Sequence, residues 1–197
     1  MEWVSRLISA PSSTSRKMSL LKTPVPANLT CSIAYHDRSF FSEALTLLTD
    51  RYGPVDAVSD PYDFSAISSH YDAEMGHPVM KCIASFQRLL PREEIAAVKR
   101  TAVALEERFS VDGKRRVNLD PGLLTMENFV LSTGKNYSHR IYLGTGVWAE
   151  VTLLFTKNGE IQPLPWTYRD YLREPASSFL LSLRSRYKAK LVSSSGG

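Results

Sequence analysis

The amino-acid sequence predicts an α+β protein with a ferredoxin-like β-α-β-β-α-β core, in which a mainly antiparallel sheet carries two helices on one face. Two observations predict this class. Short apolar runs rich in β-forming residues alternate with longer segments whose apolar residues recur at helical spacing. The 197 residues are 43% hydrophobic and 22% charged, which is typical of a globular chain long enough to bury one substantial core.

The first half of this core is a strand, a helix and a second strand. A β-rich apolar run over residues 28–37 precedes residues 39–53, where apolar side chains recur at helical spacing. Ser39 is the expected N-cap of this helix and Gly53 its C-terminal cap. Residues 54–60 alternate between apolar and polar, which predicts the second strand.

The second half follows a polar connection over residues 61–78. Residues 79–89 are expected to form a strand. Residues 91–110 are the most clearly predicted helix, because Pro and two Glu occupy its first turn, where the helix dipole favours negative charge. One face of this helix is apolar and consists of Ile95, Val98, Ala102, Leu105 and Phe109. Residues 115–120 are the fourth strand, which a Pro-Gly turn is expected to end.

An extension of two helices and a β-hairpin follows the core. Its elements are expected over residues 122–134 (helix), 139–146 and 147–166 (strands) and 174–191 (helix). Asn158-Gly159 indicates a type I′ hairpin turn within the strand region. The last helix is amphipathic and carries a basic cluster.

Both ends of the chain are expected to lie outside the domain. Residues 1–17 are interpreted as a disordered extension or an upstream start, because a serine and an arginine interrupt the apolar run that a secretory signal requires. Met18 then opens a stretch that is typical of a natural start. Residues 18–191 are expected to form a single domain, and residues 192–197 a disordered tail.

The distribution of charge and cysteine limits the classes of partner. The net charge is +4, and much of the surplus lies in residues 184–190 and in Arg16 and Lys17. A basic nucleic-acid face and a membrane span are therefore not expected. Cys31 and Cys82 stand far apart and form no CxxC pair, so neither a disulfide framework nor a zinc site is indicated, and a cytoplasmic location is expected.

Asn118 and Asp120 are the first polar residues that point to a site. Strand alternation places both on one face, opposite Val117 and Leu119 and away from the helices. Turn chemistry alone also explains an Asp before Pro-Gly. Asn118 favours a pocket, because a purely structural strand would rather place Thr or Val at that position.

His139, Arg140 and Glu150 form a second polar group. His139 is a candidate general base or metal ligand, although a lone histidine is more often structural. Glu150 interrupts an apolar strand, where a carboxylate is unfavourable unless it meets water or a cation such as Arg140, Arg116 or a metal. The Gly-x-Gly that follows His139 is weak evidence for phosphate binding, since it is also typical of an ordinary hairpin.

Several motifs with well-defined chemistry are absent. Phe129 stands where a P-loop has its first glycine and Asn136 where it has Ser or Thr, which excludes a standard nucleoside triphosphatase. The chain also lacks GxSxG, HExxH and the patterns of an RNA-recognition strand. Residues 70–76 lack the ligand and glycine positions of an EF-hand loop, and we interpret their long connection as a lid over the sheet.

The stretches YDAEMG, RRVNLDPGLLT, SHRIYLGTGVWAEVTL and PLPWTYRDY resemble an uncharacterised bacterial family, domain of unknown function 4416. The resemblance covers roughly residues 18–191. Members of this family are sometimes labelled GTP-binding proteins, and the resemblance carries that label. Among the residues that match its motifs are Tyr71, Glu74, Asn118, Asp120, His139, Arg140, Glu150 and Tyr168.

Our first hypothesis is a small-molecule site on the open face of the sheet, for a nucleotide or another phosphorylated metabolite. Asp120, His139 and Glu150 are the candidate catalytic residues, and Asp120 and Glu150 also the candidate ligands of a divalent ion such as Mg²⁺. The candidate substrate-binding residues are Asn118, Arg116, Arg140, Tyr71, Glu74 and Tyr168.

The alternative hypothesis is a module without chemistry that docks a protein or RNA through its sheet or its basic C-terminal helix. The two hypotheses make different demands on the carboxylates. A pocket should show Asp120 and Glu150 converging, with shifted pKa values, and should bind a ligand or a divalent ion. A docking module should bury neither carboxylate and should lose partner binding when the basic helix is neutralised.

Overall fold

The computed structural model describes residues 20–194, so the expectation for residues 1–17 lies outside the described residues. The same holds for residues 195–197 of the tail expected over 192–197, whereas residues 192–194 belong to the last helix. Within this range one antiparallel sheet contains nine strands. The strands are β1 (Ala27–Tyr35), β2 (Val55–Val58), β3 (Tyr62–Asp63), β4 (Met80–Leu90), β5 (Val117–Leu124), β6 (Asn128–Thr133), β7 (Ile141–Gly144), β8 (Val147–Phe155) and β9 (Ile161–Pro163). The helical elements are α1 (Arg38–Tyr52), α2 (Asp72–Met75), η1 (Arg92–Glu94), α3 (Ile95–Arg108), η2 (Arg169–Leu172) and α4 (Ala176–Ser194).

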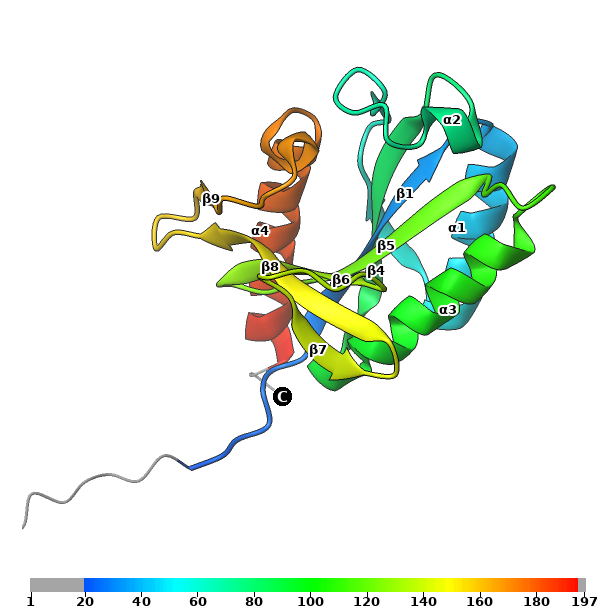
Figure 1. The fold of residues 1–197 in the computed structure, drawn as a ribbon. Coiled ribbons are helices and arrows are strands. Elements are labelled where there is room, and N and C mark those ends of the chain that lie inside the picture. Colours follow the sequence, from blue (N-terminus) through cyan, green and yellow to red (C-terminus); the bar gives the residue numbers. More distant parts are fainter. Residues whose placement is uncertain (1–19, 195–197) are drawn as a thin grey trace, which may run out of the picture.

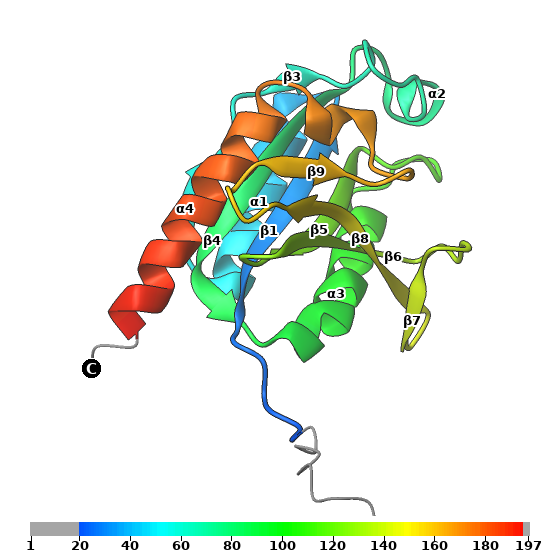
Figure 2. The same ribbon diagram turned by 90° about the vertical axis from the view of Figure 1, so that its left-hand side faces the viewer.

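The strand order is β2-β4-β1-β5-β6-β8-β7, with β3 paired to β4 and β9 to β8. The predicted α+β class and the antiparallel sheet are confirmed. Figures 1 and 2 show α1 and α3 on one face of the sheet and α4 on the other. The face that we expected to be open is therefore covered over part of its width.

Each face of the sheet has its own hydrophobic core. On the first face, β1, β4 and β5 pack against α1 and α3 through a cluster that includes Ile33, Phe41, Leu48, Phe86, Val98, Ala102 and Leu119. On the second face, α4 and η2 pack against the sheet through Ile83, Leu124, Phe129, Leu153, Tyr171, Leu180, Leu183 and Tyr187. None of the helices over residues 20–194 is long and apolar enough to cross a membrane.

The predicted helix over residues 122–134 is wrong, and β5 and β6 occupy this region instead. Leu123 belongs to the first core and Leu124 to the second, so consecutive residues are buried on opposite faces. A strand buried on both faces appears in sequence as a continuous apolar run, which periodicity does not separate from a buried helix.

The Pro-Gly pair that we expected to form a turn lies inside β5. The N–H and C=O groups of Leu119 point away from β1. This direction alternates from one residue to the next, so Pro121, two residues further on, also has its nitrogen on the outer edge of β5. Over Val117–Pro121 this edge pairs with no strand of residues 20–194, since β6 pairs only with Gly122–Leu124. The missing N–H of Pro121 therefore removes no hydrogen bond of the sheet.

Gly122 stands where β6 first approaches β5. A Cβ atom at this position would lie 2.8 Å from Phe129 Cε2 and 2.9 Å from the Val130 carbonyl oxygen. Gly122→Ala is therefore expected to lower the free energy of unfolding by about 1–3 kcal/mol through overpacking, as measured by urea denaturation. Gly134→Ala is the control, because nothing lies within 4 Å of its added Cβ, and we expect it to change stability by less than about 0.5 kcal/mol. Equal effects of the two substitutions would contradict the close approach of β6.

The remaining boundaries differ in small ways from the predicted ones. The N-cap of α1 is Asp37, whose carboxylate accepts a hydrogen bond from the Ser39 N–H at 2.8 Å, so the assignment of Ser39 as N-cap is wrong. Gly53 caps the C-terminus of α1, as predicted. The hairpin of β8 and β9 is confirmed, but Phe155 pairs with Ile161, which leaves a longer loop than a two-residue type I′ turn.

Candidate functional site

A cleft of about 800 Å³ opens where β5 separates from its neighbour. β5 pairs with β1 along its whole length but with β6 only over Gly122–Leu124, so β6 and β8 diverge from the first half of β5. Side chains from residues 64–71, β4, α3, β5, the end of β6 and residues 165–171 line the cleft, together with Arg140 and Glu150.

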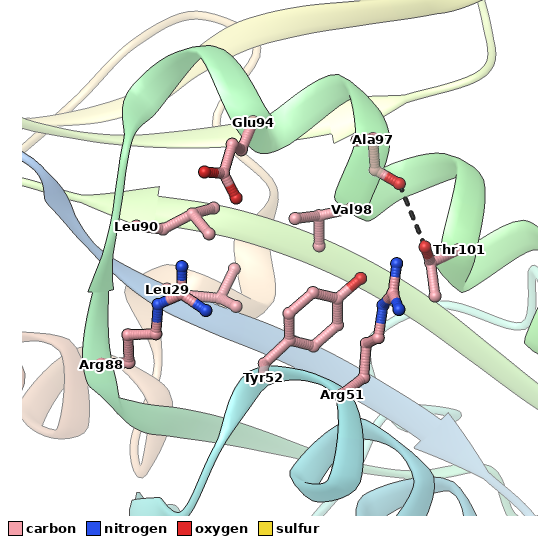
Figure 3. Close-up of a pocket in the computed structure, with 9 residues that line it drawn as sticks. All are labelled: Leu29, Arg51, Tyr52, Arg88, Leu90, Glu94, Ala97, Val98 and Thr101. Carbon is pink, nitrogen blue, oxygen red and sulfur yellow. Dashed lines mark hydrogen bonds between the residues drawn. The ribbon is translucent and has the colours of Figure 1, made fainter.

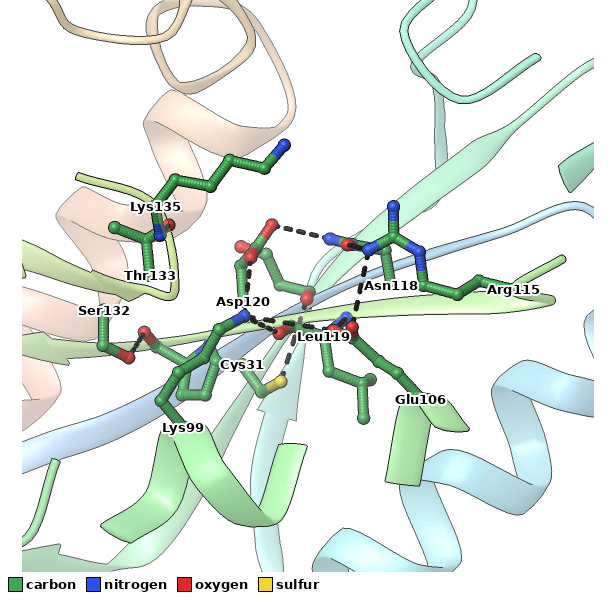
Figure 4. Close-up of polar contacts among 12 residues, drawn as sticks. Cys31, Lys99, Glu106, Arg115, Asn118, Leu119, Asp120, Ser132, Thr133 and Lys135 are labelled. Atoms are coloured by element: carbon green, nitrogen blue, oxygen red, sulfur yellow. Dashed lines mark hydrogen bonds and ion pairs between the residues drawn. The ribbon is translucent and has the colours of Figure 1, made fainter. Parts of the chain in front are cut away.

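Two side chains of α3 satisfy the unpaired edge of β5 at Leu119 (Figure 4). The Glu106 carboxylate accepts a hydrogen bond from the Leu119 N–H at 2.7 Å, and Lys99 Nζ donates to the Leu119 carbonyl at 2.8 Å. Both side chains are nearly buried, with 7% (Lys99) and 8% (Glu106) of their surface exposed. The helix thus takes the place of the missing neighbouring strand and brings two charged groups to the cleft.

Asp120 lies beside this pair on the cleft side of β5. Lys99 Nζ is 3.2 Å from Asp120 Oδ1, and Asn118 Nδ2 donates to Asp120 Oδ2 at 2.7 Å (Figure 4). Burial disfavours the Asp120 carboxylate, but the charges of Lys99 and Lys81 outweigh burial, so the pKa of Asp120 is below its ordinary value. Asp120 is therefore ionised at neutral pH.

Asp120→Asn is expected to lower the free energy of unfolding by about 1–2 kcal/mol at pH 7, because it weakens the contact with Lys99. A carboxyl group whose folded pKa is lowered stabilises the fold above its unfolded pKa of about 3.9 and loses that contribution as the pH falls through the folded pKa. The difference between wild type and variant should therefore shrink below about pH 4. Urea denaturation from pH 7 to 3 measures it, with exposed Asp50→Asn as control. A constant difference across that range would contradict the coupling to Lys99.

Arg115 ties the connection between β3 and β4 to the cleft. Its guanidinium donates two hydrogen bonds of 2.8 Å to the Glu74 carboxylate and a third, also of 2.8 Å, to Asn118 Oδ1. It also lies 5.7 Å from the centre of the Tyr71 ring. Our sequence analysis named Arg116 instead, as a residue that holds an anionic ligand. The chain bends at Arg116, before β5 begins, so the strand alternation does not reach that residue.

Glu150 also lines the cleft and is the centre of a second buried cluster. Its Oε2 lies 2.8 Å from His139 Nε2 and accepts a hydrogen bond from Arg140 Nε at 2.7 Å. Arg140 Nη2 donates to the Tyr168 hydroxyl at 3.0 Å, and the His139 ring stacks on Trp166 with centroids 4.7 Å apart. Only 1% of the Glu150 side chain is exposed. The carboxylate is thus paired with a cation, as its position in an apolar strand suggested.

Lys81 and Asp170 form a third buried ion pair. Lys81 Nζ is 2.7 Å from Asp170 Oδ2, which also accepts a hydrogen bond from the Tyr62 hydroxyl at 3.0 Å. The ammonium group lies 4.7 Å from the centre of the Tyr171 ring. Burial lowers the pKa of Lys81, but the Asp170 carboxylate outweighs it, so this pKa is raised and the lysine is charged.

The structure brings together most of the residues that the sequence singled out. Six of them line the cleft, namely Tyr71, Asn118, Asp120, Arg140, Glu150 and Tyr168. Glu74 and His139 do not line it and instead hold Arg115 and Glu150 in place. Arg116 is not part of the lining.

Sequence reasoning missed the cationic and acidic side chains that come from other elements. These residues are Lys81, Lys99, Glu106, Arg115, Lys135, Arg169 and Asp170. Lys81 carried a usable signal, because it is a charge inside an apolar strand, as Glu150 is. Lys99 and Glu106 carried a similar signal. Lys99 stands four residues after Ile95, and Glu106 four residues after Ala102, so both charges belong to the apolar face of the helix.

The two candidate metal ligands do not form a joint metal centre. Among residues 20–194 there is no group of three or more His, Cys, Asp or Glu side chains that could hold a metal ion. Asp120 pairs with Lys99, and Glu150 with Arg140 and His139. Cys31 and Cys82 are buried and free.

Comparison with known proteins identifies the family but no activity. The family model described as Domain of unknown function (DUF4416) matches residues 25–187, which include every element from β1 to most of α4. Searches of curated proteins and of solved structures gave no significant match. Because the match extends over well more than half of the chain, the protein belongs to the family of unknown function DUF4416.

Proposed function

We propose that the cleft binds a small anionic ligand, a nucleotide or another phosphorylated metabolite. The observation that carries this proposal is the surplus of cationic side chains in a cleft built from separate elements. Six such residues line it: Lys81, Lys99, Lys135, Arg115, Arg140 and Arg169. Four of the six meet carboxylates.

Lys135 and Arg169 supply the unbalanced charge. Neither side chain makes an ion pair with a carboxylate within residues 20–194. Lys135 follows the end of β6, and Arg169 begins η2, so the two approach the cleft from different elements. Cations of this kind attract phosphate groups and hold them by charge-assisted hydrogen bonds.

The size and the aromatic lining favour a ligand with a flat ring. A volume of about 800 Å³ lies within the range of small-molecule sites. Tyr168 and Trp166 are 43% and 37% exposed, and Tyr71 lies on the side of the β3–β4 connection. These rings offer stacking surfaces for a base, which supports a nucleotide within the proposed class.

We propose binding rather than catalysis. The pKa of Asp120 is lowered by Lys99 and Lys81, which makes this carboxylate a weak proton acceptor at neutral pH. The His139 ring forms a hydrogen bond with Glu150 and does not line the cleft. In this proposal Mg²⁺ binds only together with the phosphate groups of the ligand.

The observed contacts of α4 favour the pocket over the docking module. Arg186 and Lys190 both donate to Asp56, at 3.1 and 2.7 Å, so part of the basic cluster is engaged within the domain. Glu150 is 2% exposed, which a docking face would not require. We also propose that the unit from β1 to β5 is ferredoxin-like, on the basis of the order β2-β4-β1-β5.

The proposal is tested by titrating the protein with GTP, ATP, AMP and inorganic phosphate, with and without MgCl₂, by calorimetry and thermal shift. Lys135→Ala and Arg169→Ala are each expected to weaken binding about tenfold, since each removes a charge-assisted contact. Lys188→Ala is the matched control, because it removes an exposed cation on α4 and should leave binding unchanged. If no ligand raises the melting temperature, or if Lys135→Ala and Arg169→Ala bind the ligand as tightly as the control Lys188→Ala, the cleft is not the binding site of the ligand.

A further inference from the structure

A second cavity of about 250 Å³ lies on the α1 and α3 side of the sheet and shares no lining residue with the cleft. It opens between the end of α1 and the first turns of α3 (Figure 3). Leu29, Leu90 and Val98 form part of its wall, and three polar side chains, Arg51, Tyr52 and Arg88, come from α1 and β4. Arg51 and Arg88 are both exposed, and Glu94 and Thr101 add two further polar side chains to the lining.

The two arginines are not neutralised by the domain itself. Within residues 20–194 neither Arg51 nor Arg88 forms an ion pair with a carboxylate. Glu94 also lines the cavity, but in the part of the chain that the structure describes it forms an ion pair with neither arginine. Two like charges from separate elements therefore flank a cavity whose lining also includes the Glu94 carboxylate, which leaves a surplus of positive charge.

The Tyr52 hydroxyl is a buried donor that lacks a hydrogen-bond partner among the described residues. The side chains of Thr101 and Arg51 lie close enough to lower its pKa against the effect of burial, and the Thr101 hydroxyl itself donates to the Ala97 carbonyl at 3.2 Å (Figure 3). Burial raises the pKa of Tyr52, so the hydroxyl keeps its proton at neutral pH. A buried hydroxyl without a partner is unfavourable unless water or a ligand satisfies it.

We propose that this cavity binds a small oxyanion of the phosphate class, held by the guanidinium groups of Arg51 and Arg88 and by a hydrogen bond from the Tyr52 hydroxyl. The guanidinium and phenol groups are all hydrogen-bond donors, as a phosphate ligand requires. Arginine forks match the geometry of tetrahedral oxyanions, and the phenol donates one further hydrogen bond. The site is independent of the ligand proposed for the cleft, because it lies at another position and uses other residues.

The test uses inorganic phosphate and two-dimensional NMR of the ¹⁵N-labelled full chain, with sodium chloride at matched ionic strength as reference. We expect saturable shifts of the amides near Tyr52, Arg88 and Thr101. Arg51→Gln/Arg88→Gln should weaken this binding at least about tenfold, because two charge-assisted contacts are lost. Lys135→Ala should leave these shifts unchanged, which separates this site from the cleft.

Tyr52→Phe provides a second, independent readout. It should weaken phosphate binding about fivefold through the loss of one hydrogen bond to a charged ligand. In phosphate-free buffer it should leave the unfolding midpoint unchanged or raise it, since it removes an unsatisfied hydroxyl. The proposal is overturned if sodium chloride reproduces the shifts, if the double arginine variant responds like wild type, or if no amide near Tyr52 shifts.

Discussion

Glu150→Ala is expected to lower the free energy of unfolding by about 3–5 kcal/mol, the range for breaking a buried ion pair from one side. The Glu150 side chain is 1% exposed, and those of Arg140 and His139 are 11% and 13% exposed. Removing the carboxylate leaves the permanently charged guanidinium of Arg140 in a site with little access to water. Its remaining acceptors, the Lys135 carbonyl and the Tyr168 hydroxyl, are neutral.

Urea denaturation at pH 7 measures this effect, and Glu160→Ala provides the control. Glu160 is exposed in the loop between β8 and β9, so its loss should change stability by less than about 0.5 kcal/mol. In the double variant Glu150→Leu/Arg140→Leu both charges are absent, and we expect it to be less destabilised than Glu150→Ala. A loss below about 1 kcal/mol for Glu150→Ala would show that Arg140 reaches water without its partner.

Asp170→Ala is expected to have an effect of similar size, about 3–5 kcal/mol at pH 7. Only 7% of the Lys81 side chain and 2% of the Asp170 side chain are exposed, and the ammonium group lies 5.0 Å from the centre of the Phe64 ring and 4.7 Å from that of Tyr171. The variant leaves a buried charge without its counter-ion and the Tyr62 hydroxyl without its acceptor.

The pH dependence of the free energy of unfolding tests whether the buried charge of Lys81 accounts for the loss of stability in Asp170→Ala. In wild type the raised pKa of Lys81 means that its charge stabilises the fold below the unfolded pKa of about 10.4, and this contribution is lost only as the pH rises through the folded pKa. In Asp170→Ala we expect burial to lower the pKa of Lys81, so stability should rise with pH. The difference between the two proteins should therefore shrink towards pH 10 or so.

A double-mutant cycle with Lys81→Met separates the pair from the other contacts of Asp170. If the ion pair dominates, the double variant should lose clearly less stability than the sum of the two single variants. Additive losses, or a deficit that does not change with pH, would mean that packing and not charge accounts for the effect of Asp170→Ala.

Several features of the fold were predictable because they depend on local patterns. Helical spacing from Phe41 to Leu48 and from Ile95 to Ala102 located α1 and α3, and Gly53 marked the end of α1. Some of the polar residues of the candidate cleft were predictable for a related reason. Asn118 and Asp120 share a face of β5, and a carboxylate such as Glu150 inside an apolar strand requires a partner.

Other features depend on contacts between distant segments and left no readable pattern. The continuation of β5 through Pro121 requires that its outer edge face Lys99 and Glu106 of α3 and not another strand. Because the chain bends at Arg116, the arginine that contacts Asn118 is Arg115 and not the expected Arg116.

By itself the sequence determined the α+β class, the antiparallel character of the sheet and the presence of polar groups that need partners. Only the tertiary structure decided that α4 covers the second face and that β5 and β6 part beside η2 to form the cleft. The physical reason is that periodicity records which face of an element is buried, whereas the identity of the buried partner depends on packing between segments far apart in the chain.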